Sequence, residues 1–132
     1  MSEPADFQVT SVVPILRMYD LAATLRFYVE YLGCSLDWQD GEGDRPVYMQ
    51  VSRGGLRLHL SSNLDDGTPG TAVLVVASGI DELHAELRTR EYPYLNPGIE
   101  DGPGSGRTLQ LIDPASNRIR FYEPGPPSER AT

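Results

Sequence analysis

The sequence lacks the features typical of proteins that reside in an oxidising compartment, span a membrane or bind a nucleic acid. A single cysteine, Cys34, excludes an internal disulfide, and we expect it to be a small buried apolar residue at the start of a strand. The 11 Lys and Arg residues are outnumbered by 19 Asp and Glu, and this net charge of −8 disfavours nucleic acids and anionic membranes. No apolar run approaches the roughly 18 residues of a membrane span. The N-terminus also lacks the basic start and apolar core of a signal peptide. We therefore expect a cytoplasmic protein.

The length and composition favour one globular domain. The chain has 132 residues, of which 39% are hydrophobic, and this is enough for a real core. Both ends are polar, and the C-terminal end is rich in proline. We expect a flexible N-terminus over residues 1–9, a single domain over 10–124 and a disordered tail over 125–132.

The first half of the chain has the order strand, helix and three strands. The helical stretch has Asp20 as its N-cap and Gly33 just after its C-terminus. Two alternating segments then meet at Gly54-Gly55, which predicts a hairpin. The predicted elements are a strand at 10–18, a helix at 20–33, a strand at 34–39 and a hairpin over 47–62.

The same order returns in the second half, at an offset of about 60 residues. Its last two strands flank "DPASN", a stretch composed of turn-forming residues. The predicted elements are a strand at 71–78, a helix at 79–90, a short strand at 92–99 and a hairpin over 107–123. Such an internal duplication predicts two similar modules that must pair, because one short sheet and one helix bury little surface alone.

Alternation along the strands divides their side chains between two faces. The stretch 56–61 alternates leucine with Arg57, His59 and Ser61, so the polar side chains share one face. On the helix-facing side we expect Val12, Leu16, Met18, Val47, Met49, Val51, Leu56, Leu58, Leu60, Val73, Val75, Leu109, Leu111, Ile119 and Phe121. On the opposite side we expect Val13, Ile15, Arg17, Tyr48, Gln50, Arg57, His59, Ser61, Ala72, Leu74, Val76, Thr108, Gln110, Arg118, Arg120 and Tyr122. This mixed polar and aromatic face is typical of a ligand cavity.

Three stretches resemble the vicinal-oxygen-chelate superfamily, which includes glyoxalase I, extradiol dioxygenases, fosfomycin-resistance enzymes and bleomycin-resistance proteins. They are "VVPILRMYDLAATLRFYVEYLG", "GIDELHAEL" and "LIDPASNRIRFYEP", the last matching the family's Asp-Pro-x-x-Asn turn. "SVVPIL" and "LRLHLSS" are most similar to the bleomycin-resistance branch. The resemblance implies an α+β fold of two tandem βαβββ modules, residues 10–62 and 71–124, forming a cupped eight-stranded sheet.

The metal enzymes of this superfamily take their ligands from the first and last strands of each module. By resemblance these positions are Val13, His59, Ala72 and Arg120. A divalent metal needs about three nitrogen or oxygen ligands. Of these four residues, only His59 can act as a metal ligand. Glu123 is a nearby carboxylate, but its parity places it on the other face from Arg120. We therefore expect no metal, no cofactor and no catalytic residue set.

Three hypotheses of function remain. In the first, the chain is a metal-free binding protein that resembles bleomycin-resistance proteins and sequesters an organic ligand or antibiotic; a cationic glycopeptide suits the acidic surface. In the second, it is a superfamily enzyme of lyase, isomerase or dioxygenase type acting on a small oxygen-rich substrate. In the third, it is a domain whose cavity has no dedicated ligand. A general base is one alternative role for His59, although no Ser, Cys or carboxylate is placed to complete a catalytic set.

The binding hypothesis names a ligand site and an assembly. Trp38 either rims the cavity or plugs the core, and the loop 91–106 either forms a lip or is an ordinary connection. The resemblance implies a homodimer in which a neighbour closes each cup, with no nucleic-acid or membrane partner. The candidate ligand-binding residues are Trp38, Tyr48, Gln50, Arg57, His59, Arg120 and Tyr122.

Overall fold

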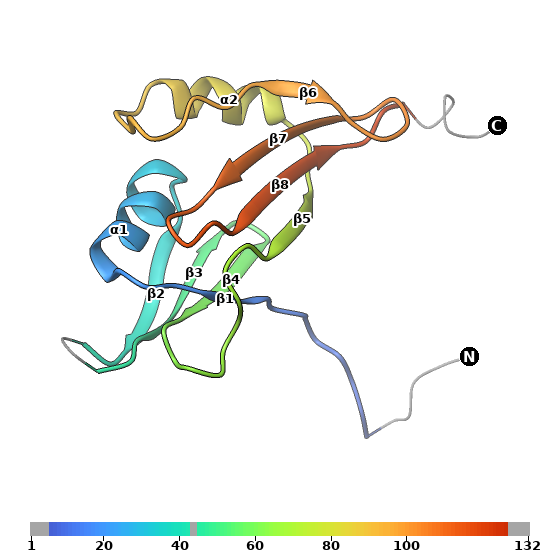
Figure 1. Cartoon of the computed structure of the whole chain (residues 1–132). Helices are drawn as coiled ribbons and strands as arrows, with labels where there is room; N and C mark the ends of the chain where they lie inside the picture. Colours follow the sequence, from blue (N-terminus) through green and yellow to red (C-terminus); the bar gives the residue numbers. More distant parts are fainter. Residues whose placement is uncertain (1–5, 43–44, 127–132) are drawn as a thin grey trace.

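A computed structural model describes residues 6–42 and 45–126 (Figure 1). The positions 1–5 and 127–132 of the two predicted flexible ends lie outside these described residues. In the first module, Asp20 caps the helix, because its Oδ1 accepts a hydrogen bond from the Ala23 amide at 2.8 Å. Gly33 follows the helix with a φ of 82°, as the sequence predicts. The elements are β1 (Ile15–Arg17), α1 (Leu21–Leu25), the π-helical η1 (Arg26–Tyr31), β2 (Ser35–Asp40), β3 (Tyr48–Arg53) and β4 (Leu56–Ser61).

The second module repeats this order. Its helix begins after Gly79, and the predicted turn 113–117 is closed by Asp113, whose Oδ1 accepts from the amides of Ala115 and Asn117. The elements are β5 (Ala72–Val76), α2 (Ile80–Arg88), β6 (Ile99–Asp101), β7 (Arg107–Ile112) and β8 (Arg118–Glu123). The α+β fold of two tandem βαβββ modules is therefore confirmed.

The eight strands form two four-stranded sheets in place of one continuous sheet. Sheet A has the order β1-β4-β3-β2 and sheet B has the order β5-β8-β7-β6. In each sheet the first and last strands of the module pair in parallel and the other pairs are antiparallel. The two sheets thus have the same topology, which agrees with an internal duplication.

A single core joins the two modules. Apolar side chains from both sheets and both helices pack together, so the helix-facing sides of the strands are buried, as alternation predicts. The fully buried members include Leu16, Phe27, Leu58, Ile80 and Leu109, and Cys34 is buried with them. The opposite face of each sheet, which we call the outer face, contributes nothing to this core.

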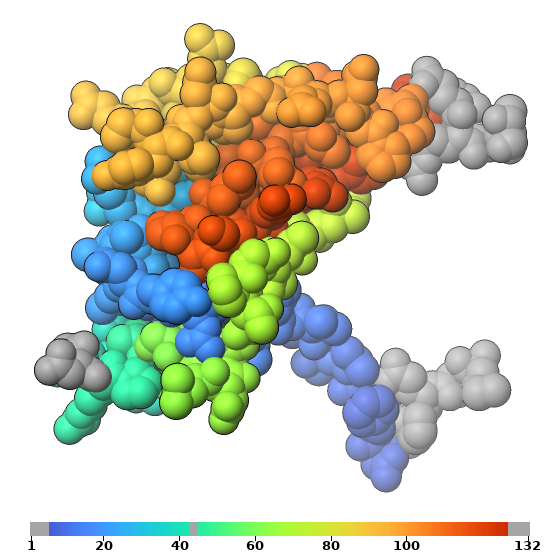
Figure 2. Space-filling view, viewed as in Figure 1, coloured from blue at the N-terminus to red at the C-terminus, as the bar shows by residue number. Residues whose placement is uncertain are grey.

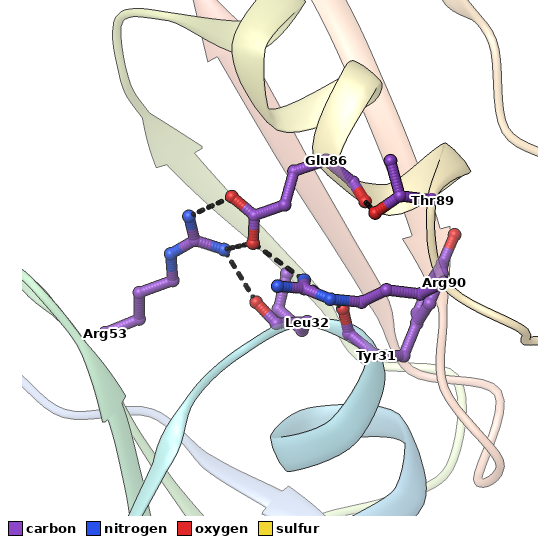
Figure 3. A network of polar contacts seen from close by, with 6 residues as sticks. All are labelled: Tyr31, Leu32, Arg53, Glu86, Thr89 and Arg90. Carbon is purple, nitrogen blue, oxygen red and sulfur yellow. Dashed lines mark hydrogen bonds and ion pairs between the residues drawn. The ribbon is translucent and has the colours of Figure 1, made fainter.

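Polar contacts also join the modules. Tyr28 donates to Oδ2 of Asp113 at 2.6 Å, and Asn117 donates to the Arg17 carbonyl at 2.8 Å. On the other side of the core, Glu86 of α2 accepts hydrogen bonds from Nη1 and Nη2 of Arg53 and pairs with Arg90 (Figure 3). The same two arginines donate to the Leu32 and Tyr31 carbonyls at the end of η1. This network thereby connects β3, α2 and the C-terminal end of η1.

Two predicted strands begin later in the structure than the sequence indicates. Val12 is 85% exposed instead of facing the helix, because β1 begins only at Ile15, after Pro14. Residues 6–12 instead project from the body as an extended segment (Figure 2). The strand predicted at 92–99 also begins later, at Ile99, because Pro93 and Pro97 cannot donate to a ladder. None of the helices in the described part of the chain is long and apolar enough to cross a membrane.

Candidate functional site

One row of side chains crosses the outer face of sheet A. The strand registers place Ile15 beside His59, His59 beside Gln50, and Gln50 beside Trp38. Neighbouring strands lie about 4.8 Å apart, so each side chain of the row reaches the next. The row therefore unites three of the predicted ligand-binding residues, on β2, β3 and β4.

Trp38 belongs to this face and not to the core. Its ring stacks on that of Tyr48, with centroids 5.9 Å apart and planes at 9°. His59 meets both rings edge-on, at 5.2 Å from Trp38 and 5.1 Å from Tyr48. Trp38 remains 44% exposed. Of the two alternatives that the sequence leaves open, this placement excludes the core plug.

A chain of hydrogen bonds assigns the protons of the cluster. Gln50 donates through Nε2 to Asp37 at 2.9 Å, so its Oε1 faces Nε2 of His59, also at 2.9 Å. An amide oxygen only accepts, and Nε2 of His59 must therefore be the donor. In a neutral imidazole the other nitrogen is an acceptor, so Nδ1 accepts a hydrogen bond from the Tyr48 hydroxyl at 2.6 Å. The imidazole is thus fixed in one tautomer.

The charges around this cluster are of both signs. The Gln50 amide, then Ser52 and the positive charge of Arg57, hold the pKa of the Asp37 carboxyl below its ordinary value. Partial burial, with the nearby charge of Asp66, raises the pKa of the Tyr48 hydroxyl. Arg57 is exposed at the margin of the cluster, so the site offers both a carboxylate and a guanidinium to a ligand.

Sheet B carries the counterpart of this arrangement. Arg120 lies opposite Gln110 in the β7–β8 register, as His59 lies opposite Gln50 in the β3–β4 register. Nε and Nη2 of Arg120 both donate to Oε1 of Gln110, at 3.0 and 2.9 Å. In each module a glutamine oxygen thus orients the basic side chain of the last strand.

Tyr122 is also on the outer face of sheet B, but its hydroxyl is already engaged. The hydroxyl donates to the Pro103 carbonyl at 2.9 Å, and the Tyr122 ring packs against Gly102 and Gly106. A Cβ at Gly106 would overlap this ring, so glycine is required for the close approach. The loop 91–106 therefore contacts Tyr122 through Gly102, Pro103 and Gly106.

The seven predicted ligand-binding residues fall into two groups. One group lies on sheet A and the other, Arg120 with Tyr122, lies on sheet B. Among the described residues, no hydrogen bond, ion pair or ring contact links one group to the other. The two groups lie on different sheets of one chain, and we call them the sheet A and sheet B half-sites. The sheet A group is Trp38, Tyr48, Gln50, Arg57 and His59.

Arg17 and Ser61 are not open to this face, although their parity predicts it. The turn that follows β4 folds back over them. Arg17 is 7% exposed and donates to the Leu64 and Gly67 carbonyls, while Ser61 is fully buried and donates to Asp66. Alternation gives the face of a strand, but it cannot show which loop covers that face.

Asp37 is a site residue that the sequence analysis missed. Its carboxylate reaches Gln50 because the β2–β3 register shifts between Leu36 and Trp38. A bulge of this kind turns two successive side chains toward nearly the same side. Residues 35–39 alternate strictly between polar and apolar, so the sequence carries no indication of this bulge.

The donor set does not fit a divalent metal. In the paired strands, Ile15 lies beside His59 and Leu74 lies beside Arg120, so each basic residue has an apolar neighbour on the parallel strand. Neither Val13 nor Ala72 has a ligating atom, and Arg120 places a fixed positive charge where an anionic ligand is needed. The described part of the chain has no group of three His, Cys, Asp or Glu side chains able to hold a metal ion.

Comparison with known proteins places this geometry in a family. A model described as "Glyoxalase superfamily protein" matches residues 3–126, nearly the whole chain. The chain belongs to the glyoxalase superfamily. None of the curated proteins compared with it matches.

Solved structures share this glyoxalase-superfamily fold. The bleomycin resistance determinant encoded on transposon Tn5 is 21% identical, with a TM-score of 0.68 over 87% of this chain and 98% of its own. The bleomycin-binding protein of Streptomyces verticillus, solved with copper(II)-bleomycin, is 26% identical, with a TM-score of 0.67 over 90% and 99%. A glyoxalase-related enzyme of Clostridium phytofermentans is 20% identical, with a TM-score of 0.68 over 91% and 98%. The fold is thus similar to those of both binding proteins and an enzyme.

Proposed function

We propose that the chain is a metal-free binding protein that holds a small organic ligand and releases it unchanged. The ligand lies between the outer face of sheet A in one chain and the outer face of sheet B in a second copy. A glycopeptide antibiotic of the bleomycin type is the first candidate ligand, since two of the similar structures are complexes with bleomycin. The cytoplasm is its expected location.

The observation that carries this proposal is the exposed aromatic platform on sheet A. Trp38 is held in place by two rings, and the polar atoms of Tyr48, Gln50 and His59 already satisfy one another. A flat ligand can stack on such a platform without breaking any of these hydrogen bonds. Asp37 suits a cationic group of the ligand, and Arg57 with the partner's Arg120 suits an anionic one.

A second copy is proposed because each chain leaves the two half-sites apart. Apolar side chains on and beside the outer faces are also uncovered, and a dimer would bury them. An interface that closes two such sites would bury on the order of 1,600 Å². The exposed fractions are 43% for Ile15, 60% for Leu74, 65% for Val76, 56% for Val9 and 85% for Val12.

Binding is tested by titrating metal-free bleomycin, copper-bleomycin and a set of small aromatic carboxylates into the protein. Trp38 is the only tryptophan, so its fluorescence reports directly on the platform. We expect saturable quenching with one ligand per chain, and mass spectrometry should recover the ligand intact. Trp38→Ala should weaken binding by about tenfold or more, measured by calorimetry. The control Tyr94→Ala, outside both half-sites, should leave the affinity for bleomycin unchanged. Absence of saturable binding for the whole set contradicts the proposal.

One observation favours a second candidate, the superfamily enzyme. The short Tyr48–His59 hydrogen bond resembles a general acid–base pair, because Nδ1 of a neutral imidazole can take up a proton. Conversion of a bound compound at a rate that His59→Ala abolishes and Arg118→Gln preserves would establish this candidate instead. Arg118 is a suitable control because its exposed side chain lies at the far end of β8.

A further inference from the structure

A cavity lies away from both half-sites. Its volume is about 590 Å³, within the usual range for small-ligand pockets. Three segments form it: the exposed side of α1, the connection that follows α2, and the end of β7 with the turn after it. In Figure 2 the gold surface of that connection adjoins the blue surface of α1. The lining includes Ala22, Arg26, Tyr92, Tyr94, Ile112 and Pro114.

Aromatic contacts hold one wall of the cavity in place. Tyr92 stacks on Tyr31 with ring centroids 4.4 Å apart and planes at 17°, and it meets Phe27 edge-on. Tyr94 packs edge-on against Tyr92, yet it remains 69% exposed. Ile112 is 42% exposed on the opposite side. The walls are therefore apolar, partly uncovered and anchored to the core.

The charge inside this cavity is positive, although the chain as a whole is acidic. The Arg26 guanidinium lies over the rings of Tyr92 and Tyr94, 5.8 and 5.5 Å from their centroids. None of the ion pairs found in the described part of the chain involves Arg26. A guanidinium oriented by two rings and free of a carboxylate partner is suited to bind an anion.

Both oxygens of the one carboxylate that lines the cavity, Asp113, already accept hydrogen bonds within the protein. Oδ1 of Asp113 accepts from the amides of Ala115 and Asn117, while Oδ2 accepts from the Tyr28 hydroxyl and from Nδ2 of Asn117. Asp113 is 6% exposed, so its charge is directed into the turn and not toward a ligand. The ligand-facing charge of the cavity is therefore that of Arg26.

We propose that this cavity is a binding site for a small flat organic anion, an aromatic carboxylate or sulfonate. The apolar body lies between Tyr94 and Ile112, and the anionic group is bound by Arg26. None of these residues belongs to the two half-sites on the outer faces, so this site exists whether or not the outer faces bind a ligand.

A matched pair of fluorescent probes separates the two parts of the proposal. The anionic probe is 1-anilinonaphthalene-8-sulfonate, and the neutral probe is N-phenyl-1-naphthylamine, which has the same rings without the sulfonate. We expect the folded protein to bind the anion about tenfold more tightly than the neutral probe. Arg26→Gln should remove this difference by weakening only the anion, whereas Tyr94→Ala should weaken both probes.

Controls locate the binding. Arg118→Gln removes an exposed arginine elsewhere and should leave both affinities unchanged. Amide chemical shifts of the 15N-labelled protein should change mainly over residues 22–26 and 92–95. The proposal is overturned if Arg26→Gln leaves the affinity for the anion unchanged while circular dichroism shows a native fold. It is also overturned if the shifts centre on sheet A, or if neither probe binds saturably.

Discussion

His59 shows how the partners of one side chain determine its chemistry. The position belongs to a set that metal enzymes of the superfamily use for ligands, yet here both ring nitrogens are occupied by Tyr48 and Gln50. The orientation of the Gln50 amide toward Asp37 decides which nitrogen carries the proton. Asp37, two hydrogen bonds away from the imidazole, thus fixes its tautomer.

This assignment can be measured on His59 directly. In 15N-labelled protein above the titration range of imidazole, Nε2 should have the chemical shift of a protonated nitrogen and Nδ1 that of an unprotonated one. Tyr48→Phe removes the hydroxyl donor but leaves the Gln50 oxygen in place, so Nε2 should stay protonated. Asp37→Ala frees the Gln50 amide to turn, so the second tautomer should appear. The ring-nitrogen chemical shifts of His84, whose Nε2 contacts the Pro97 carbonyl, should be unaffected and serve as the internal control. Protonation of Nδ1 in the unaltered neutral protein contradicts the assignment.

Tyr28 predicts a loss of stability in alkali. Burial, reinforced by Asp113, raises the pKa of its hydroxyl well above the ordinary 10.0. The folded chain therefore holds this proton more tightly than the unfolded chain does. The resulting stability is present below about pH 10 and is lost as the pH rises further.

Urea unfolding of Tyr28→Phe tests this effect. At pH 8 the variant should lose about 1–2 kcal/mol, because Asp113 loses one buried donor. Between about pH 10 and pH 11 the variant should lose less further stability than the unaltered protein. Tyr19→Phe, on an exposed side chain, is the control and should follow the unaltered protein. Equal alkaline losses in Tyr28→Phe and the unaltered protein would rule out this role.

At the scale of the elements, the sequence predicted the alternating strands best. Leu58 and Leu60 are buried and His59 faces outward because β4 is flanked by strands on both sides and follows a clear period of two. The caps at Asp20 and Gly33 were predictable because their chemistry is local. Both depend on contacts between near neighbours in the chain.

The errors arise where distant segments meet. Arg17 is covered by a turn some 50 residues later in the chain, and no local pattern records that contact. Asp37 joins the site only through a bulge, which alternation does not reveal. The separation of the outer faces into half-sites is likewise a property of how the modules pack.

The Arg53–Glu86–Arg90 network predicts a small, pH-dependent link between β3 and α2. Hydrogen bonding to Arg53, followed by Arg90, holds the pKa of the Glu86 carboxyl below its ordinary 4.5. Its contribution to stability is therefore present above about pH 4.5 and is lost as the pH falls through the lower folded value. These side chains are 31–38% exposed, which limits the contribution to about 1 kcal/mol or less.

Glu86→Gln should lower the free energy of unfolding by that amount near neutral pH and much less in acid. The difference should also shrink in high salt, because exposed charges are screened. Glu91→Gln is the matched control, since Glu91 is exposed and close in sequence. A loss that is the same at acid and neutral pH would show that the carboxylate charge is not responsible.

For the whole molecule, the exposed apolar residues on β5 predict self-association. Leu74→Asp places a charge on a side chain that is 60% exposed in one chain and buried in the proposed dimer. Light scattering should give a dimer mass for the unaltered protein and a monomer mass for the variant, with circular dichroism unchanged. Leu64→Asp is the control because Leu64 is 96% exposed and lies on the turn after β4, not on β5. A monomer mass for the unaltered protein contradicts the dimer.

The separation between core and outer face has a consequence for evolvability. The side chains that hold the two modules together point toward the helices, whereas Trp38, Tyr48, Gln50 and His59 point the other way. Variation on the outer face therefore does not disturb the packing that makes the chain fold. A library randomised at these four positions should stay folded in most of its members, as circular dichroism can show, because none of the four side chains belongs to the core. A small duplicated domain of this kind can change the molecule it recognises and still remain folded.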